Sequence, residues 1–355
     1  MKKILMLLMA LVMSVSLCAC ASGEGEEPQE NIEKAEADES TTDDGKTTEA
    51  VSDDAQFIGI NIGYPDMEFF KMVEYGLKKS FDEQGWTYVV TYGGEEKMTE
   101  NAATMIAQGI DALVDFGTNQ SFGNAVASLC DDAQIPCITI DVEYDGAYFF
   151  GADNKQAGEC LGVEMCEWIE ENWDGKVDAV WVDYSISSGE IVNQRATCAI
   201  DMFQEKFGLS EDDVFWFDQA NQGGEYCQQG LSDFLSSHSE YEKVAAITTT
   251  ESYVTYMVGA AETLGKSQDV CYGAHSESSW TFNHFKETEA ETDTYIGCVA
   301  YAPQNYGAGI VTMLETLFAG GEIEGNTTME HYVITRDNYE QIWNESFGPA
   351  LESIS

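Results

Sequence analysis

The sequence has few basic residues: its 355 residues include 16 Lys and Arg against 64 Asp and Glu, a formal net charge of −48. An acid excess of this size repels phosphate backbones, which excludes nucleic-acid binding as a function. It argues equally against a basic patch that docks on anionic lipid. A solvated acidic surface, with no specific partner for its charge, is the interpretation we adopt.

Motifs of catalysis and metal binding are also missing. The ten cysteines include no C-x-x-C pair, which excludes a zinc ribbon and a thioredoxin-like site. There is no P-loop, no G-x-S-x-G elbow and no H-E-x-x-H helix. The sequence therefore predicts a protein that binds without chemistry: not an enzyme, with no cofactor and no metal.

The N-terminus has the pattern of an export signal. Two lysines precede an apolar run over residues 4–15, which is too short for a typical membrane span. The run ends in Leu17-Cys18-Ala19-Cys20, which resembles the lipobox of bacterial lipoproteins. That resemblance implies a signal peptide over 1–19, lipidation at Cys20 and anchoring at the extracytoplasmic face of the cell membrane. The alternative is an ordinary secretory peptide with incidental cysteines.

Residues 21–56 have the composition of a disordered segment. They hold 13 acids and two lysines, and Ile32 and Val51 are their only large apolar side chains. Such a stretch cannot bury enough surface to offset its ordering entropy. We predict that residues 20–56 form the lipidated N-terminus and a disordered acidic tether.

In the remaining body, 57–355, short apolar runs alternate with segments of helical periodicity. Residues 57–62 are a strand-like run, and after them apolar residues recur every three or four positions, at Met67, Phe70, Val73, Leu77 and Phe81. About ten such units follow one another, which predicts two doubly wound α/β domains with parallel sheets. Ligands of such sheets bind beyond the carboxyl ends of the strands.

Several segments then match one family. They are Glu68-Phe69-Phe70 before a helix, IAQGIDAL at 106–113, IPCITID at 135–141 and GADN at 151–154. In this order they resemble the type I periplasmic binding proteins, in the branch of ribose- and galactose-binding proteins, over nearly all of 57–355. The resemblance implies two Rossmann-like lobes joined by three hinge crossings, with the N-terminal lobe at 57–152 plus 302–329 and the C-terminal lobe at 153–301 plus 330–355.

The family implies a function as well. Its members are the solute receptors of ABC importers, so the chain is expected to deliver a small polar ligand, a sugar or a similar polyol, to ABC permease subunits by hinge closure. We expect a monomer that contacts the membrane through its lipid anchor only. Two alternatives stay open: a sensory binding protein that presents its ligand state to a membrane receptor, and an exported α/β hydrolase, for which no triad can be assembled.

Candidate ligand contacts follow the predicted strands. Phe69 and Phe70 offer aromatic faces to a sugar, although Phe70 has the spacing of a core residue. Asp141, at the end of the fourth strand, aligns with a ligand-binding Asp that the family commonly follows with Arg, where this chain has Val142. Arg195 aligns with an Arg that forks onto ligand oxygens; a surface ion pair is the alternative. An open cleft would leave Asp141 and Arg195 in water, so the free protein should tolerate their loss.

Three further candidates replace polar residues of the family. Thr250, His275 and Tyr301 stand where the family often has Asn, Asp and Gln, and all three retain hydrogen-bonding groups. A lone His is equally compatible with a structural role. Cys130 and Cys137 are close enough in sequence to pair, but buried free thiols are the expectation for the cysteines of the body.

Overall fold

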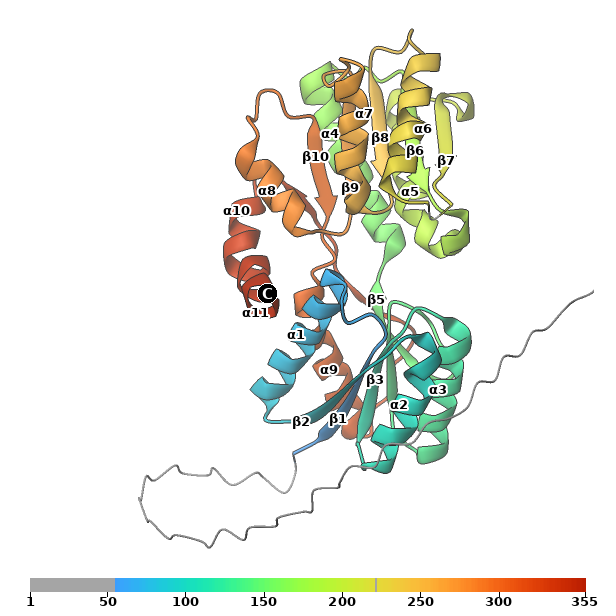
Figure 1. Cartoon of the computed structure of the whole chain (residues 1–355), viewed down its shortest axis with the longest axis vertical. Helices are drawn as coiled ribbons and strands as arrows, with labels where there is room; N and C mark the ends of the chain where they lie inside the picture. Colours follow the sequence, from blue (N-terminus) through green and yellow to red (C-terminus); the bar gives the residue numbers. More distant parts are fainter. Residues whose placement is uncertain (1–54, 221) are drawn as a thin grey trace, which may run out of the picture. The chain divides into compact units, whose positions relative to one another are not determined.

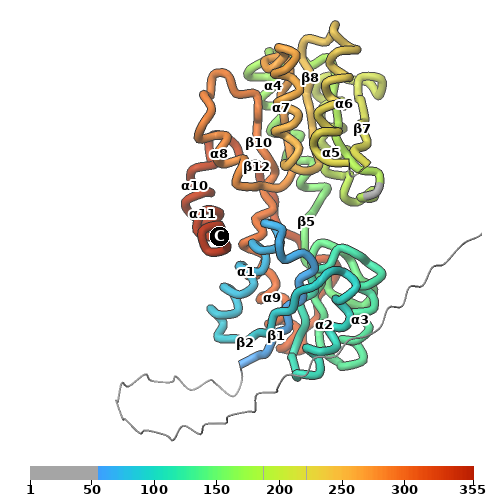
Figure 2. The backbone as a smooth tube through the Cα atoms, in the orientation of Figure 1, coloured from blue at the N-terminus to red at the C-terminus, as the bar shows by residue number. Residues whose placement is uncertain are grey.

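The computed structural model describes residues 55–220 and 222–355. The predicted signal peptide, Cys20 and the tether up to residue 54 lie outside the described residues. Within the described residues the chain forms two six-stranded sheets, each flanked by helices (Figure 1; Figure 2). The predicted α/β fold with two doubly wound parallel sheets is confirmed. We call each sheet with its helices a lobe.

The first lobe is entirely parallel, with strand order β11-β5-β4-β3-β1-β2. Helices α1 and α9 cover one face of the sheet and α2 and α3 the other, each over its own apolar cluster. The elements are β1 (Phe57–Ile62), α1 (Glu68–Gln84), β2 (Thr87–Tyr92), α2 (Glu95–Ala107), β3 (Ala112–Phe116), α3 (Gln120–Ala133), β4 (Cys137–Ile140), β5 (Tyr148–Ala152), α9 (Tyr306–Phe318) and β11 (Thr327–Met329).

The second lobe has strand order β12-β10-β9-β8-β6-β7, and only β12 runs antiparallel. Helices α4 and α5 cover one face; α6, α7, α8 and the C-terminal helices pack on the other. The elements are α4 (Asn154–Trp173), β6 (Ala179–Tyr184), α5 (Gly189–Phe207), β7 (Val214–Asp218), α6 (Gly224–Ser237), β8 (Val244–Thr248), α7 (Val254–Thr263), β9 (Val270–His275), α8 (Ser279–Glu287), β10 (Tyr295–Val299), β12 (Val333–Thr335), α10 (Tyr339–Ile342) and α11 (Gly348–Ile354), with single turns at Ile186–Ser188, Glu211–Asp213, Glu251–Tyr253, Pro303–Asn305 and Trp343–Phe347.

The periodicity of the sequence missed the shortest strands. β11 and β12 have three residues each, which is too short for an alternation of buried and exposed positions to be recognised. β5 was missed as a strand, although its last two residues belong to the segment that resembles a hinge crossing. Helix α2 begins at Glu95 and has two glutamates in its first turn, where negative charge is favourable.

The chain passes between the sheets three times: from β5 to α4, from β10 to α9, and from β11 to β12. One imidazole joins these crossings. His331, between β11 and β12, accepts a hydrogen bond at Nε2 from the Asp153 N–H (3.0 Å), and its Nδ1 lies 2.9 Å from the Ala300 carbonyl oxygen. Because burial lowers the pKa of His331, the ring is neutral and fits this pairing of one acceptor with one donor.

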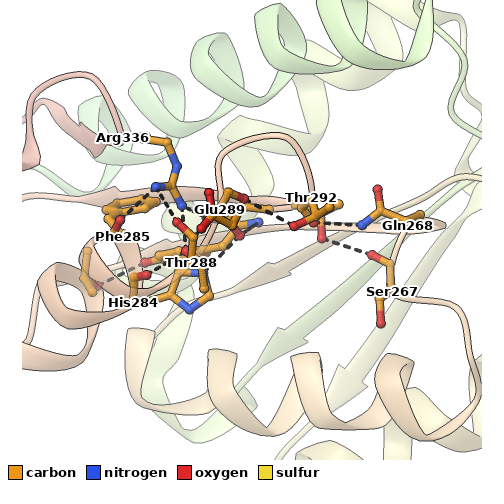
Figure 3. Close-up of polar contacts among 12 residues, drawn as sticks. Ser267, Gln268, His284, Phe285, Thr288, Glu289, Thr292 and Arg336 are labelled. Atoms are coloured by element: carbon orange, nitrogen blue, oxygen red, sulfur yellow. Dashed lines mark hydrogen bonds and ion pairs between the residues drawn. The ribbon is translucent and has the colours of Figure 1, made fainter.

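A second set of polar contacts fixes the loop between α8 and β10 (Figure 3). The Arg336 guanidinium donates to the carbonyl oxygens of Phe285 and Thr288 and forms an ion pair with Asp293. The same Asp293 carboxylate lies 3.0 Å from His284 Nε2. These contacts tie the chain after β12 to the loop that precedes β10, so this guanidinium has a structural role.

Candidate functional site

Asp141 lies directly after β4, at the carboxyl edge of the first sheet. Its φ of 60° is left-handed, and its carboxylate accepts hydrogen bonds from the Ala152 N–H (3.1 Å) and from the Tyr306 hydroxyl (3.3 Å). Burial raises the pKa of Asp141 to about 6, against the opposing effects of the Ala152 hydrogen bond and the positive charge of Arg195. These hydrogen bonds hold the carboxylate at the first crossing, where it interacts electrostatically with Arg195 of the other lobe.

Arg195 lies in the second turn of α5, half-buried. Its Nε donates to Asn154 Oδ1 (2.7 Å) and its Nη1 to the carbonyl oxygen of Thr249 (3.2 Å). The face of the guanidinium stands 4.6 Å from the centre of the Tyr301 ring. The chain contains only two arginines, and Arg336 is committed to the α8–β10 loop. Arg195 is thus the one guanidinium available at the carboxyl edges of the sheets.

His275 and Tyr301 form the buried floor behind Arg195. Their exposed fractions are 0% and 2%. His275 Nε2 lies 3.0 Å from the Arg195 carbonyl oxygen, and His275 Nδ1 lies 3.4 Å from the Tyr301 hydroxyl. Burial and the Arg195 charge hold the pKa of His275 well below its usual value. A neutral ring that donates at Nε2 and accepts at Nδ1 satisfies both contacts, so these side chains position Arg195.

Thr250 lies in the loop between β8 and the single turn at Glu251–Tyr253. It is half-buried after β8, and its hydroxyl lies 3.3 Å from that of Ser252. In the loop after β9, the buried carboxylate of Glu277 accepts hydrogen bonds from the Tyr301 and Ala302 N–H groups, both at 2.7 Å. Glu277 thus stabilises the backbone where the second crossing begins.

The two phenylalanines of the first lobe separate by depth. Phe70 is 6% exposed and stacks on Phe116 with ring centres 3.9 Å apart, so it belongs to the core. Phe69 is half-buried and packs against the apolar clusters of both lobes. It also meets Tyr306 edge-on at 6.0 Å.

The structure therefore brings Asp141, Arg195, His275 and Tyr301 together beside the crossings, with Phe69 close to Tyr306. Sequence reasoning missed four partners of this cluster: Tyr306, Asn154, Glu277 and His331. Glu277 lies four residues after the apolar run at 269–273, which is typical of a strand, so this position could have suggested it. Tyr306 has only the apolar periodicity of a helix around it, and its contact with Asp141 spans 165 residues.

The part of the chain that the structure describes offers few other features that could form a functional site. It contains no cluster of three or more Cys, His, Asp or Glu suited to a metal ion. None of its helices has the length and apolarity to cross a membrane. The eight described cysteines are free thiols, Cys130 and Cys137 included. A cavity of about 480 Å³ lies between α1 and α11, lined by Lys71 and Tyr75, away from the cluster beside the crossings.

Comparison with known proteins agrees with this architecture. The family model of the periplasmic binding protein domain matches residues 58–322. No curated protein matches the chain. Among solved structures, a periplasmic ribose ABC transporter protein from Conexibacter woesei has a TM-score of 0.71 at 13% identity, covering 84% of this chain and 97% of that one. A solute-binding protein from Actinobacillus succinogenes with bound D-allose has a TM-score of 0.66 at 16% identity (81% and 99% covered). A solute-binding protein from Bacillus halodurans with bound myo-inositol has a TM-score of 0.62 at 16% identity (81% of this chain and 96% of that one covered).

Proposed function

Since the chain belongs to the periplasmic binding protein domain family, we propose that it is the extracytoplasmic receptor of an ABC importer for a sugar or a similar polyol. Membership of this family makes it a binding protein rather than an enzyme, as the sequence predicts. The two lobes close on the ligand by bending at the three crossings, and the closed form is what the permease subunits recognise.

The convergence of Asp141 and Arg195 beside the crossings carries this proposal. A carboxylate and a guanidinium from different lobes can accept from and donate to the hydroxyls of one ligand, with charge-assisted hydrogen bonds. Arg195 is already oriented by Asn154 and by the Tyr301 ring, so it loses little side-chain entropy when it binds. Phe69 supplies an aromatic face nearby, against which a sugar ring packs.

The location follows from the N-terminal sequence. We propose that the mature chain begins at lipidated Cys20 and acts as a monomer at the outer face of the cell membrane, held through its lipid and the tether. Mass spectrometry of the protein from a membrane fraction should find a diacylated cysteine at its N-terminus. A mature chain that begins elsewhere, or with an unmodified Cys20, contradicts the anchor.

A ligand screen tests the receptor function. The mature chain is melted with D-ribose, D-allose, D-galactose and myo-inositol, and compounds that raise the melting temperature are titrated by calorimetry. A ligand at 100 times its Kd should stabilise the protein by about 2.7 kcal/mol. Replacing Asp141 by Ala should cost about 2–4 kcal/mol of binding, because the ligand hydroxyls lose their charged acceptor.

The matched control is Asp212→Ala, which removes an exposed acid from the single turn before β7 and should leave the affinity unchanged. A receptor for sugars or polyols is contradicted if no such compound raises the melting temperature. The placement of the ligand is contradicted if Asp141→Ala binds it as tightly as the wild type.

A further inference from the structure

Exposed apolar side chains gather at the carboxyl ends of the strands. Eleven large apolar residues of the described chain are 37–64% exposed. Seven of these lie at the end of a strand, in the loop that follows it or in the first turn of the next helix. They are Tyr64, Met67, Tyr92, Phe122, Ile186, Ile191 and Tyr226. Single exposed apolar residues are ordinary, but a concentration at one edge indicates a surface that becomes covered.

Within that edge the apolar residues lie away from the crossings. Five of the seven follow or end β1, β2 or β6, and these strands stand near one end of each sheet order. The crossings leave from β5, β10, β11 and β12 at the other end. The polar cluster of Asp141, His275 and Tyr301 lies at the ends of β4, β9 and β10, on the crossing side. Each lobe thus changes from polar to apolar across its sheet.

A hollow marks the apolar end in the first lobe. It has a volume of about 400 Å³ at the ends of β1 and β2, and Tyr64, Met67 and Tyr92 are among its lining residues. From the end of β4, where Asp141 lies, to the end of β2 is three strand spacings, about 14 Å. One sugar ring does not span that distance, whereas a sugar with a bulky substituent does.

Two loops at the apolar end hold few charged residues, although Asp66 lines the hollow and Glu95 accepts hydrogen bonds from Thr118. Residues 117–122, which include Phe122, hold no charged side chain, and residues 185–193, which include both isoleucines, hold one, Glu190. The body around them has 51 acids. The two isoleucines are 63% and 64% exposed, more than any other large apolar side chain described. This combination suits a neutral apolar group.

We propose that the ligand is a glycoside with an apolar aglycone, its sugar beside Asp141 and Arg195 and its aglycone on the apolar end formed by Tyr64, Met67, Ile186 and Ile191. The inference rests on the proposed function and specifies the ligand of the same site. Burying the aglycone removes apolar surface from water, and the tyrosine ring adds a flat contact for it. A free sugar would make only the polar contacts with Asp141 and Arg195.

Matched pairs of compounds test the aglycone. The mature chain is titrated with D-glucose and 4-nitrophenyl β-D-glucopyranoside, with D-galactose and its 4-nitrophenyl β-glycoside, and with D-ribose and its 4-nitrophenyl β-glycoside. At least one glycoside should bind ten times more tightly than its free sugar. In the double variant Ile186→Ser, Ile191→Ser this affinity ratio should fall about tenfold.

Val163→Ser is the matched control, because Val163 is 42% exposed on α4, outside both carboxyl edges, and its loss should leave the ratio unchanged. The melting temperature of each variant without ligand checks its folding. If the double variant weakens glycoside and free sugar equally, the isoleucines serve lobe closure and the inference fails. The inference also fails if free sugars bind as tightly as their glycosides. That result would not contradict the receptor function. If none of the six compounds binds, the inference is contradicted, whereas the receptor function is contradicted only when the screen of sugars and polyols described above also finds no ligand.

Discussion

At the scale of single residues, the contacts of Arg195 differ from those expected of an open cleft. A guanidinium surrounded by water would contribute to ligand affinity but not to the stability of the free protein. Here it bonds to Asn154 and to the Thr249 carbonyl and lies over the Tyr301 ring, so it joins α4, β8 and the second crossing even without ligand. Loss of Arg195 should therefore affect both the free protein and binding.

We predict that Arg195→Ala lowers the free energy of unfolding by about 1–3 kcal/mol, because hydrogen bonds of a charged donor are lost and their acceptors stay partly buried. Arg195→Lys should not restore either stability or affinity, since an ammonium lacks the planar fork whose edge bonds to two acceptors while its face lies over a ring. Denaturant unfolding and calorimetric titration measure the two effects.

Lys155→Ala is the control for charge, because Lys155 is an exposed partner of Glu159 on α4 and should contribute little. Unchanged stability in Arg195→Ala would mean that the contacts of the guanidinium are incidental. Full rescue by Lys would show that charge alone suffices.

At the scale of elements, the contact of α4 with α5 determines where Arg195 lies. Gly158 on α4 is buried against α5, and a Cβ at this position would stand 2.4 Å from the Gln194 carbonyl oxygen and 2.9 Å from that of Arg195. Backbone atoms cannot move aside as the end of a side chain can. The absence of a side chain at Gly158 therefore lets the first turns of α5 approach the start of α4.

We predict that Gly158→Ala destabilises the fold by about 1–3 kcal/mol, the usual cost of overpacking, and weakens ligand binding by displacing Arg195. Gly259→Ala on α7 is the matched control, because the nearest atoms there belong to the flexible side chain of Gln228. That change should be neutral or stabilise by about 0.5–1 kcal/mol, as expected for Gly→Ala inside a helix. Equal effects of the two variants on unfolding would contradict the close approach.

At the scale of the whole molecule, burial and charge act on stability in the same direction. Burial raises the pKa values of Asp115, Asp183 and Glu251 to about 7. A carboxyl that binds its proton more tightly when folded contributes stability at low pH, and this is lost as the pH rises through its folded pKa. The net charge of the chain, −48, adds self-repulsion that grows as the carboxyls ionise.

We predict that the free energy of unfolding is higher at pH 6.5 than at pH 8.5 by about 2 kcal/mol, since each pKa unit corresponds to about 1.4 kcal/mol. Below pH 6.5 the buried His275 and His331 act in the opposite sense, because their pKa values are lowered by folding. The combined change Asp115→Asn, Asp183→Asn, Glu251→Gln should flatten the profile between pH 6.5 and 8.5. Urea unfolding at several pH values measures it; a wild type equally stable at both ends refutes the prediction.

The alternation of strands and helices, and with it the fold and the family, could be predicted from the sequence. Residues 57–62 and the stripe from Met67 to Phe81 became β1 and α1 because burial of one face repeats at short, regular intervals in the chain. The excess of acids and the absence of catalytic motifs are properties of composition and need no structure.

Only the tertiary structure decided the depth of each candidate and its partners. Phe69 and Phe70 are neighbours in sequence, yet one packs between the lobes and the other in the core, because adjacent helical positions point in different directions. His275 and Tyr301 became the floor behind Arg195 rather than an open surface. The bonds of Arg195 reach residues 41 and 54 positions away, and no local periodicity encodes a contact made by the meeting of distant strands and helices.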